Sequence, residues 1–357
     1  MAKRSRSKKS LIKASRHLFK IQQNIAKQAK IILPEQLKAA NVLLGRPDPQ
    51  KRGEWRKHVF IAPAFSDKKL VSRLDYYVFK PSPTVRHPDT KGMPLVVMLH
   101  GCQQDASVFA QGTQMNVIAQ RNGFLVLYPQ QSRRNHIANC WRWHDLSDNQ
   151  GMAEAHSIMK IIHSTILMHG LDPQKVFIAG LSAGAAMAGI LAASFPEQFN
   201  ALAMHSGPVL GRAHDLQTAV KVMQDDFSDS DQALASYMAG FTPPHRHLMP
   251  TIILQGERDR IVHKRNAQEL VKQFLYLNNI PLESLGITTR YHPRSNKEYS
   301  QTLYRDGRKR MLELIAIKRL DHAWAGGDDR LPFNSKYGPN SSQLIWHFFK
   351  GHLARSK

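Results

Sequence analysis

Short apolar runs alternate with longer amphipathic stretches along most of this chain. The runs 94–101 (PLVVMLHG) and 251–256 (TIILQG) are almost wholly apolar, which is typical of strands buried on both faces of a parallel sheet. Residues 151–170 (GMAEAHSIMKIIHSTILMHG) instead have helical spacing. The alternation predicts an α/β fold, a mostly parallel central sheet with helices on both faces. Further strands are predicted at 74–80, 124–129, 175–180, 201–207 and 311–318, and further helices ending near 199 and covering 341–357.

A different pattern occupies the N-terminus. Apolar residues recur every seven positions at Leu11, Leu18, Ile25 and Ile32, and residues 1–32 hold ten Lys and Arg and no acid. This stretch predicts an amphipathic helix with a basic face, which suits an anionic surface such as a membrane, a granule or nucleic acid. The alternative is a solvated tail followed by a helix that docks on its own domain.

Composition refines this division. Proline, glycine and charged residues crowd residues 45–55 (GRPDPQKRGEW), so we expect a basic extension over residues 1–50 and one α/β domain over residues 51–357. The chain of 357 residues has a net charge of +23, and removing the ten charges of the extension leaves +13. No motif of a nucleic-acid-binding module accompanies this charge.

Targeting signals and cysteines narrow the class of protein further. No apolar run approaches the roughly 18 residues of a membrane span. The N-terminus has no apolar signal-peptide core, which predicts a cytoplasmic protein, with an extracellular one as the alternative. Only two cysteines are present, which excludes a disulfide-stapled scaffold.

The most informative motif lies between a predicted strand and a predicted helix. Residues 180–184 read Gly-Leu-Ser-Ala-Gly, a G-x-S-x-G pattern centred on Ser182. A tight strand–turn–helix of this kind lifts the serine hydroxyl clear of the sheet, and its glycines let the chain pass without Cβ clashes. The context predicts Ser182 as a nucleophile, and an ordinary Gly-rich turn is the alternative.

A serine nucleophile needs a base and an acid that orients the base, and in this architecture they follow the serine in the order acid, then histidine. Asp259 and His322 each come just after a predicted strand, in that order. Rival residues are Glu257 and Asp321 for the acid and His263 for the base. We prefer Asp259 because G-x-x-D beyond a strand is the usual acid loop in this architecture.

An oxyanion hole requires backbone N–H donors aimed at the charge that develops in the transition state. One expected donor is Ala183, the residue after the nucleophile. The other should come from the loop after an earlier strand, and Cys102 in LHGCQQ is the candidate there.

Together with these residues, the stretches LHGCQQ, NCWRW, GLSAG and HAWAGG resemble the polyhydroxybutyrate (PHB) depolymerase family of esterases, within the α/β-hydrolase superfamily. The similarity spans roughly residues 70–350. One departure is Asp321, which stands where the family usually has glycine before HAW. The resemblance implies an α/β-hydrolase fold and these roles: nucleophile Ser182, acid Asp259, base His322, oxyanion-hole donors Cys102 and Ala183, and a disulfide between Cys102 and Cys140.

We therefore predict a serine esterase that acts on poly- or oligo(3-hydroxyalkanoate) or related short-chain esters through an acyl-enzyme, with no metal or organic cofactor. Secreted depolymerases of this family carry a separate polymer-binding domain that is not expected here, so soluble esters or oligomers are favoured. The first alternative is a feruloyl- or acetyl-xylan-type carbohydrate esterase, and the second is an anionic-surface binding protein with a vestigial hydrolase domain. Trp141, Trp143 and Trp324 are candidates for the wall of an acyl pocket, with core packing as the alternative.

Overall fold

The computed structural model describes residues 53–66, 68–84, 89–146, 150–224, 237–238 and 248–353. The helix predicted within residues 1–32 and the boundary predicted at residue 50 lie outside these residues. The strands are Glu54–Ile61 (β1), Arg73–Lys80 (β2), Leu95–Leu99 (β3), Leu125–Gln130 (β4), Val176–Leu181 (β5), Ala201–His205 (β6), Thr251–Gly256 (β7), Ile287–Tyr291 (β8), Tyr299–Asp306 (β9), Lys309–Ile317 (β10), Trp324–Ala325 (β11) and Asn334–Ser335 (β12).

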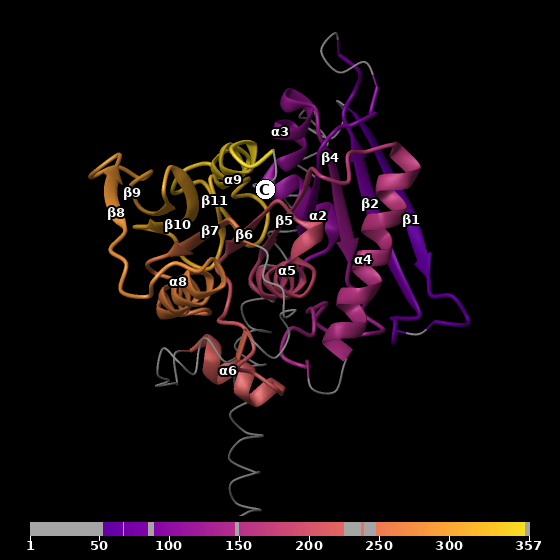
Figure 1. Cartoon of the computed structure of the whole chain (residues 1–357), viewed down its shortest axis with the longest axis horizontal. Helices are drawn as coiled ribbons and strands as arrows, with labels where there is room; N and C mark the ends of the chain where they lie inside the picture. The colour runs from indigo at the N-terminus through magenta and orange to yellow at the C-terminus, as the bar shows by residue number, and fades with distance from the viewer. Residues whose placement is uncertain are drawn as a thin grey trace, which may run out of the picture. The chain divides into compact units, whose positions relative to one another are not determined.

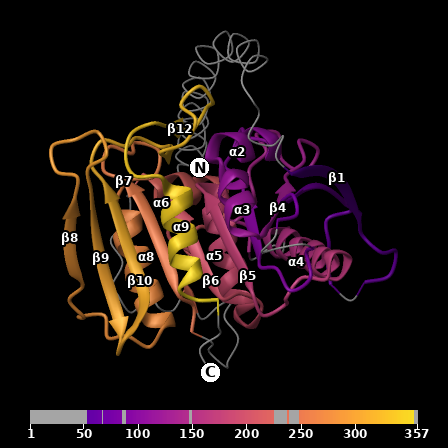
Figure 2. The same ribbon diagram turned by 90° about the horizontal axis from the view of Figure 1, so that it is seen from above.

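A ten-stranded sheet organises the domain, in the order β1-β2-β4-β3-β5-β6-β7-β10-β9-β8. Figure 2 shows these strands side by side, from β8 in orange to β1 in indigo. Neighbours between β4 and β10 run parallel, whereas β1 and β2 at one edge and β9 and β8 at the other are added antiparallel. The predicted α/β class and mostly parallel sheet are confirmed.

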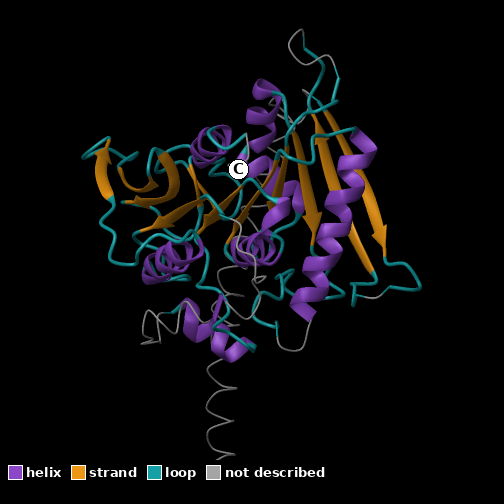
Figure 3. Cartoon of the chain, viewed as in Figure 1, coloured by secondary structure: helices purple, strands orange, loops and turns teal. Residues whose placement is uncertain are grey.

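Helices cover both faces of this sheet, as Figures 1 and 3 show. The helices are Ala106–Thr113 (α2), Met115–Asn122 (α3), Gln150–His169 (α4), Ala183–Ser194 (α5), Leu216–Met223 (α6), Arg265–Leu277 (α8) and Ser341–Lys350 (α9), with a 3-10 turn at Pro196–Gln198. One core layer includes residues of α4, α5, α6 and α8, and the other includes residues of α2, α3 and α9. No helix of the described residues is both long and apolar enough to cross a membrane.

The period-two alternation of strand side chains explains why the central strands are apolar throughout. In β3, Val97 belongs to one core layer, whereas Val96 and Met98 belong to the other. In β5, Ile178 and Phe177 divide in the same way. Because both faces are buried, every position of these strands must be apolar, which is the pattern that predicted them.

Parallel strands also bring their carboxyl ends to one edge of the sheet. Loops that leave this edge after β3, β5, β7 and β10 contain Cys102, Ser182, Asp259 and His322, respectively. Since β5, β6, β7 and β10 are consecutive neighbours, residues more than a hundred positions apart in the chain come together.

Candidate active site

The turn from β5 into α5 holds Ser182 in a conformation that few non-glycine residues adopt. Its φ is 57° and its ψ is −122°, and it directly precedes the first residue of α5. Such a conformation costs of order 1–3 kcal/mol and persists only where the surroundings enforce it. The N–H of Ser182 donates to the carbonyl of His205 at 2.9 Å, which ties the turn to the neighbouring strand β6.

Two glycines make this turn sterically possible. A Cβ at Gly180 would lie 2.2 Å from the carbonyl oxygen of Gly184, and a Cβ at Gly184 would lie 2.2 Å from the carbonyl oxygen of Leu99. Both contacts are with backbone, which cannot move aside cheaply. The G-x-S-x-G pattern is thus required by the packing of α5 against β3 and against its own turn.

Asp259 and His322 are in contact after β7 and β10, which β6 separates from the strand β5 that precedes Ser182. The Nδ1 of His322 lies 2.8 Å from Oδ2 of Asp259. An ionised carboxylate can only accept hydrogen bonds, so in neutral His322 the proton belongs on Nδ1 and Nε2 keeps its lone pair. The hydrogen bonds of the described residues do not include one between Ser182 Oγ and His322 Nε2, a contact that commonly tightens only when substrate binds.

Backbone hydrogen bonds join the two loops that carry these residues. The N–H of Glu257 donates to the carbonyl of Ile317 at 2.9 Å, and the N–H of Arg258 donates to that of Leu320 at 3.1 Å. A Cβ at Gly256 would lie 2.3 Å from the carbonyl oxygen of Leu320, so the chains are in direct contact there. The position of Asp259 relative to His322 is therefore set by main chain.

The surroundings of Asp259 keep its carboxylate ionised. Burial of this side chain would by itself raise its pKa, but the charge of His322, the hydrogen bond from that residue and the N–H groups of Val262 and Ile261 outweigh burial and hold the pKa below its ordinary value. Both N–H groups donate to Oδ1 at 2.9 Å. Gln255 Nε2 donates to Oδ2 at 3.2 Å, so both oxygens are occupied.

The rival acids occupy different environments. Glu257 forms an ion pair with Lys318 at 3.0 Å, and Asp321 is exposed. Among the acids that the sequence offered, the structure places Asp259 in contact with His322.

The loop after β3 lies against the nucleophile turn. A Cβ at Gly101 would lie 3.5 Å from the Cβ of Ser182, so the residue that precedes Cys102 lies close to the serine. Ala183 is the first residue of α5, where N–H groups have no partner within the helix and the helix dipole favours an anion. This arrangement suits the two donors expected from sequence.

Cys102 is also covalently fixed. A disulfide joins it to Cys140, with the two Cα atoms 4.3 Å apart. The N–H of Gln103 donates to the carbonyl of Ala138 at 2.6 Å, which adds a main-chain link beside the disulfide. The loop after β3 is thus fastened to the loop after β4.

A buried polar network that the sequence reading missed supports these two loops. Neutral His100 hydrogen-bonds through Nδ1 to the carbonyl of Gly101 at 2.8 Å and accepts the N–H of Gln131 at Nε2. The side chain of Gln131 donates to Glu154 at 2.6 Å and to the carbonyl of Cys140 at 3.1 Å. Burial raises the pKa of Glu154 to about 7. The only sequence signal for this network was polar residues at or near the ends of buried segments.

Comparison with known proteins places the chain in a family. A family model described as Esterase PHB depolymerase matches residues 75–292, more than half of the chain. The chain belongs to this esterase family. Poly(3-hydroxyalkanoate) depolymerase C of Paucimonas lemoignei is 31% identical over 189 residues, which cover 52% of this chain and 45% of the relative. Feruloyl esterase B of Thermothelomyces thermophilus is 27% identical over 250 residues, which cover 66% of this chain and 79% of the relative.

A solved structure gives the same fold. The acetyl xylan esterase from Aspergillus awamori superposes with a TM-score of 0.67 at 20% identity, covering 84% of this chain and all of that one. The α/β-hydrolase fold expected from sequence is thereby confirmed. The matched residues of this chain span less than half of the length of that depolymerase.

The three candidate tryptophans lie in the core. Trp141, Trp143 and Trp324 are 0%, 4% and 1% exposed. The indole N–H of Trp141 donates to the carbonyl of His100 at 3.1 Å, and that of Trp324 donates to Ser342 Oγ at 3.2 Å. The structure therefore places these three side chains in the core, which is the alternative to an acyl pocket that the sequence left open.

His205 is a further residue beneath the site that the sequence reading did not single out. It ends β6, stacks on Trp324 with ring centroids 5.0 Å apart and accepts the N–H of Ala325 at Nε2. Burial, with a smaller contribution from the charge of His322, lowers the pKa of His205 to about 3. The neutral ring of His205 therefore lies between the turn at Ser182 and the loop that carries His322.

Proposed function

We propose that this protein is a serine carboxylic ester hydrolase that acts through an acyl-enzyme on Ser182. The observation that carries the proposal is the contact between His322 and Asp259 at the sheet edge where a strained turn presents Ser182. Membership of the esterase family supports the same chemistry.

In the proposed reaction, His322 Nε2 takes the proton of Ser182 as the serine oxygen attacks the ester carbonyl. The N–H groups of Ala183 and Cys102 stabilise the oxyanion. The alcohol leaves with the proton from His322. Water, deprotonated by the same nitrogen, then attacks the acyl-enzyme and releases the carboxylic acid, and Asp259 stabilises the charged imidazole in both halves.

The nucleophile is tested by the variant Ser182→Ala. We expect turnover of p-nitrophenyl butyrate to fall by at least about 10³-fold, because the remaining groups cannot form an acyl-enzyme. Ser194→Ala is the matched control at the other end of α5, since Ser194 Oγ is buried and has no hydrogen-bond partner within the described part of the chain. Undiminished turnover in the Ser182 variant would sink the mechanism.

A fluorophosphonate probe addresses the alternative of a vestigial hydrolase domain. The proposed enzyme should be labelled covalently at Ser182, and prior heat unfolding should abolish the labelling. A folded wild-type protein that takes up no label would favour the binding-protein alternative.

For the substrate class, we propose poly- or oligo(3-hydroxyalkanoate) or related short-chain esters, supported by the similarity to depolymerase C. Similarity to feruloyl esterase B supports carbohydrate esters as the second candidate. Measuring kcat/KM on hydroxybutyrate oligomers, methyl ferulate and acetylated xylo-oligosaccharides separates the two candidate classes. The class with the highest kcat/KM identifies the substrate.

We also propose that residues 1–32 attach the enzyme to an anionic surface. Ten basic residues without an acid support this proposal. Deletion of residues 1–32 should weaken salt-sensitive binding to vesicles that contain phosphatidylserine, or to nucleic acid, and leave turnover of soluble ester unchanged. Loss of turnover would instead assign the segment to the folded domain.

A further inference from the structure

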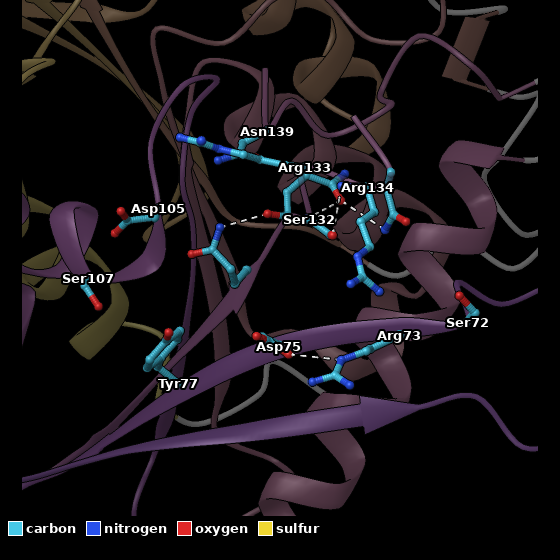
Figure 4. Close-up of a pocket in the computed structure, with 13 residues that line it drawn as sticks. Ser72, Arg73, Asp75, Tyr77, Asp105, Ser107, Ser132, Arg133, Arg134 and Asn139 are labelled. Carbon is cyan, nitrogen blue, oxygen red and sulfur yellow. Dashed lines mark hydrogen bonds and ion pairs between the residues drawn. The ribbon is translucent and has the colours of Figure 1, made fainter. Parts of the chain in front are cut away.

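A polar cavity of about 680 Å³ opens beside the loop that follows β3 and carries Cys102, which we call the oxyanion loop. Its walls come from the first half of β2, the end of β4, the loop that follows β4, and Asp105 and Ser107 at the start of α2. Figure 4 shows the Arg134 side chain reaching from that loop toward Arg73 and Asp75 on β2. We call this cavity the arginine cleft, after Arg73, Arg133 and Arg134 in its wall.

The arginine cleft lies at the same sheet edge as the catalytic residues. Gln130, in its wall, ends β4 and pairs with Asp75 of β2. Strand β4 is separated from β5 by β3 alone, and two strand spacings amount to about 10 Å. The loop that carries Arg133 and Arg134 is fastened to the oxyanion loop by the Cys102–Cys140 disulfide.

The acidic side chains that line the arginine cleft already have partners. Asp75 pairs with Lys57, 2.6 Å away, and with Arg73, 3.6 Å away. Asp105 caps α2 by accepting the N–H of Val108 at 2.8 Å.

Two arginines on the loop after β4 have no such partners within the described part of the chain. The guanidinium groups of Arg133 and Arg134 are exposed and make no ion pair or hydrogen bond with any residue that the structure describes. Neighbouring Asn139 and Ser132 add neutral polar groups to the same wall. The cleft thus offers two unpaired fork-shaped donors, a combination that suits a carboxylate.

We propose that the arginine cleft binds a carboxylate carried by the leaving-group side of the ester. This inference rests on the proposed esterase function and names its substrate as a short oligomer of hydroxy acids with a free carboxyl terminus. In such an oligomer, attack by Ser182 breaks the acyl C–O bond, and the fragment that leaves as an alcohol is the one that ends in the carboxylate. That alcohol takes its proton from His322, and water then frees the other fragment as a hydroxy acid.

The spacing fits this assignment. A hydroxybutyrate unit adds four backbone atoms, roughly 4–5 Å when extended, by scaling from about 3.5 Å for the three backbone atoms of a peptide residue. Two units therefore span about the two strand spacings that separate β5 from β4, whose last residue, Gln130, lines the cleft. Neutral feruloyl or acetyl esters have no group that would pair with Arg133 and Arg134.

The experiment compares hydroxybutyrate trimer with the methyl ester of the same trimer. In the wild type at low salt we expect kcat/KM to be about tenfold or more higher for the free acid. The double variant R133A/R134A should lose that preference by lowering kcat/KM for the free acid about tenfold, while the value for the methyl ester changes less than about twofold. Arg308→Ala, an exposed arginine in the β9–β10 turn, controls for the loss of general positive charge and should keep the preference.

In this comparison, three outcomes would overturn the proposal: no preference in the wild type, equal losses on acid and ester, or the same loss in Arg308→Ala. A further arm tests acetylated xylo-oligosaccharides with a uronic acid and with that acid reduced to an alcohol. A dependence on Arg133 and Arg134 seen only in this arm would overturn the oligoester and assign the cleft to a polysaccharide carboxylate. Hydrolysis of p-nitrophenyl butyrate by each variant, with S182A as the blank, tests separately whether the protein is an esterase that uses Ser182.

Discussion

At the scale of single residues, Asp259 shows how neighbouring groups can keep the pKa of a buried carboxyl low. Its side chain is wholly inaccessible, yet both carboxylate oxygens accept hydrogen bonds and His322 lies beside it, so the pKa stays below its ordinary value. The carboxylate can therefore hold His322 in the required tautomer throughout the pH range in which an esterase works.

The substitution Asp259→Asn tests this role. We expect kcat on p-nitrophenyl butyrate to fall by roughly 10³–10⁴-fold, because an amide can face His322 with its NH₂ group and favour the wrong tautomer. Glu257→Gln is the control, since Glu257 pairs with Lys318 instead. Equal losses in the two variants would mean that the acid has been misassigned.

The buried histidines predict a dependence of stability on pH. Burial lowers the pKa of His100 to about 4 and that of His205 to about 3, both below the ordinary 6.5. The unfolded chain therefore binds more protons than the native chain between pH 6.5 and about 4, so stability is lost as the pH falls through that window, at about 1.4 kcal/mol per histidine for each pH unit.

Glu154 acts in the opposite direction. Its pKa is raised to about 7, so its contribution weakens the native state as the pH rises from 4.5 to 7. Two histidines outweigh one glutamate, and we expect urea unfolding midpoints to fall from pH 6.5 to pH 4. A midpoint that rises on acidification would contradict the assignment of both rings as neutral.

At the scale of elements, the nucleophile turn depends on close backbone approach. Gly184→Ala should lower the free energy of unfolding by about 3 kcal/mol or more, since the new Cβ would lie 2.2 Å from a carbonyl oxygen. Urea unfolding measures the change. Gly92→Ala is the control: its φ of +71° carries a strain of about 1–2 kcal/mol, but no atom lies within 4 Å of the new Cβ. Because Gly184 has no positive φ, equal losses in the two variants would mean that its close contact with the backbone does not cost what we expect.

Elements buried on both faces were predicted well from sequence, and edge elements were not. The helix predicted at 151–170 is observed at Gln150–His169, and the strand predicted at 311–318 is observed at Lys309–Ile317. Strands β1, β8 and β9 were missed. Their residues, all exposed or half-buried except Tyr299, show no continuous apolar run, because hydrogen bonds to a neighbouring strand more than burial hold them in the sheet.

At the scale of the whole molecule, the disulfide joins loops from two strands and closes a sequence separation of 38. The double variant C102S/C140S should lose roughly 3–4 kcal/mol of stability and show a lower melting temperature by roughly 5–15 °C. Its kcat should also fall, by up to about 10²-fold, because the Cys102 N–H is less well positioned.

Dithiothreitol supplies the control for this prediction. It should bring the wild type to the level of the double variant and leave the double variant unchanged. A wild type that keeps its stability and kcat when fully reduced would contradict the role of the bond.

By itself, the sequence determined the class of fold, the strained serine turn and the order of Ser182, Asp259 and His322. These properties are local or depend on the period of apolar residues, so a linear pattern contains them. The tertiary structure decided which acid contacts His322 and where the tryptophans pack. It also decided how hydrogen bonds among Glu154, Gln131 and His100 hold the oxyanion loop. It also brought Arg133 and Arg134 to the edge of a cleft with Arg73. Such contacts follow from the order of strands in the sheet, and that order depends on packing between distant segments.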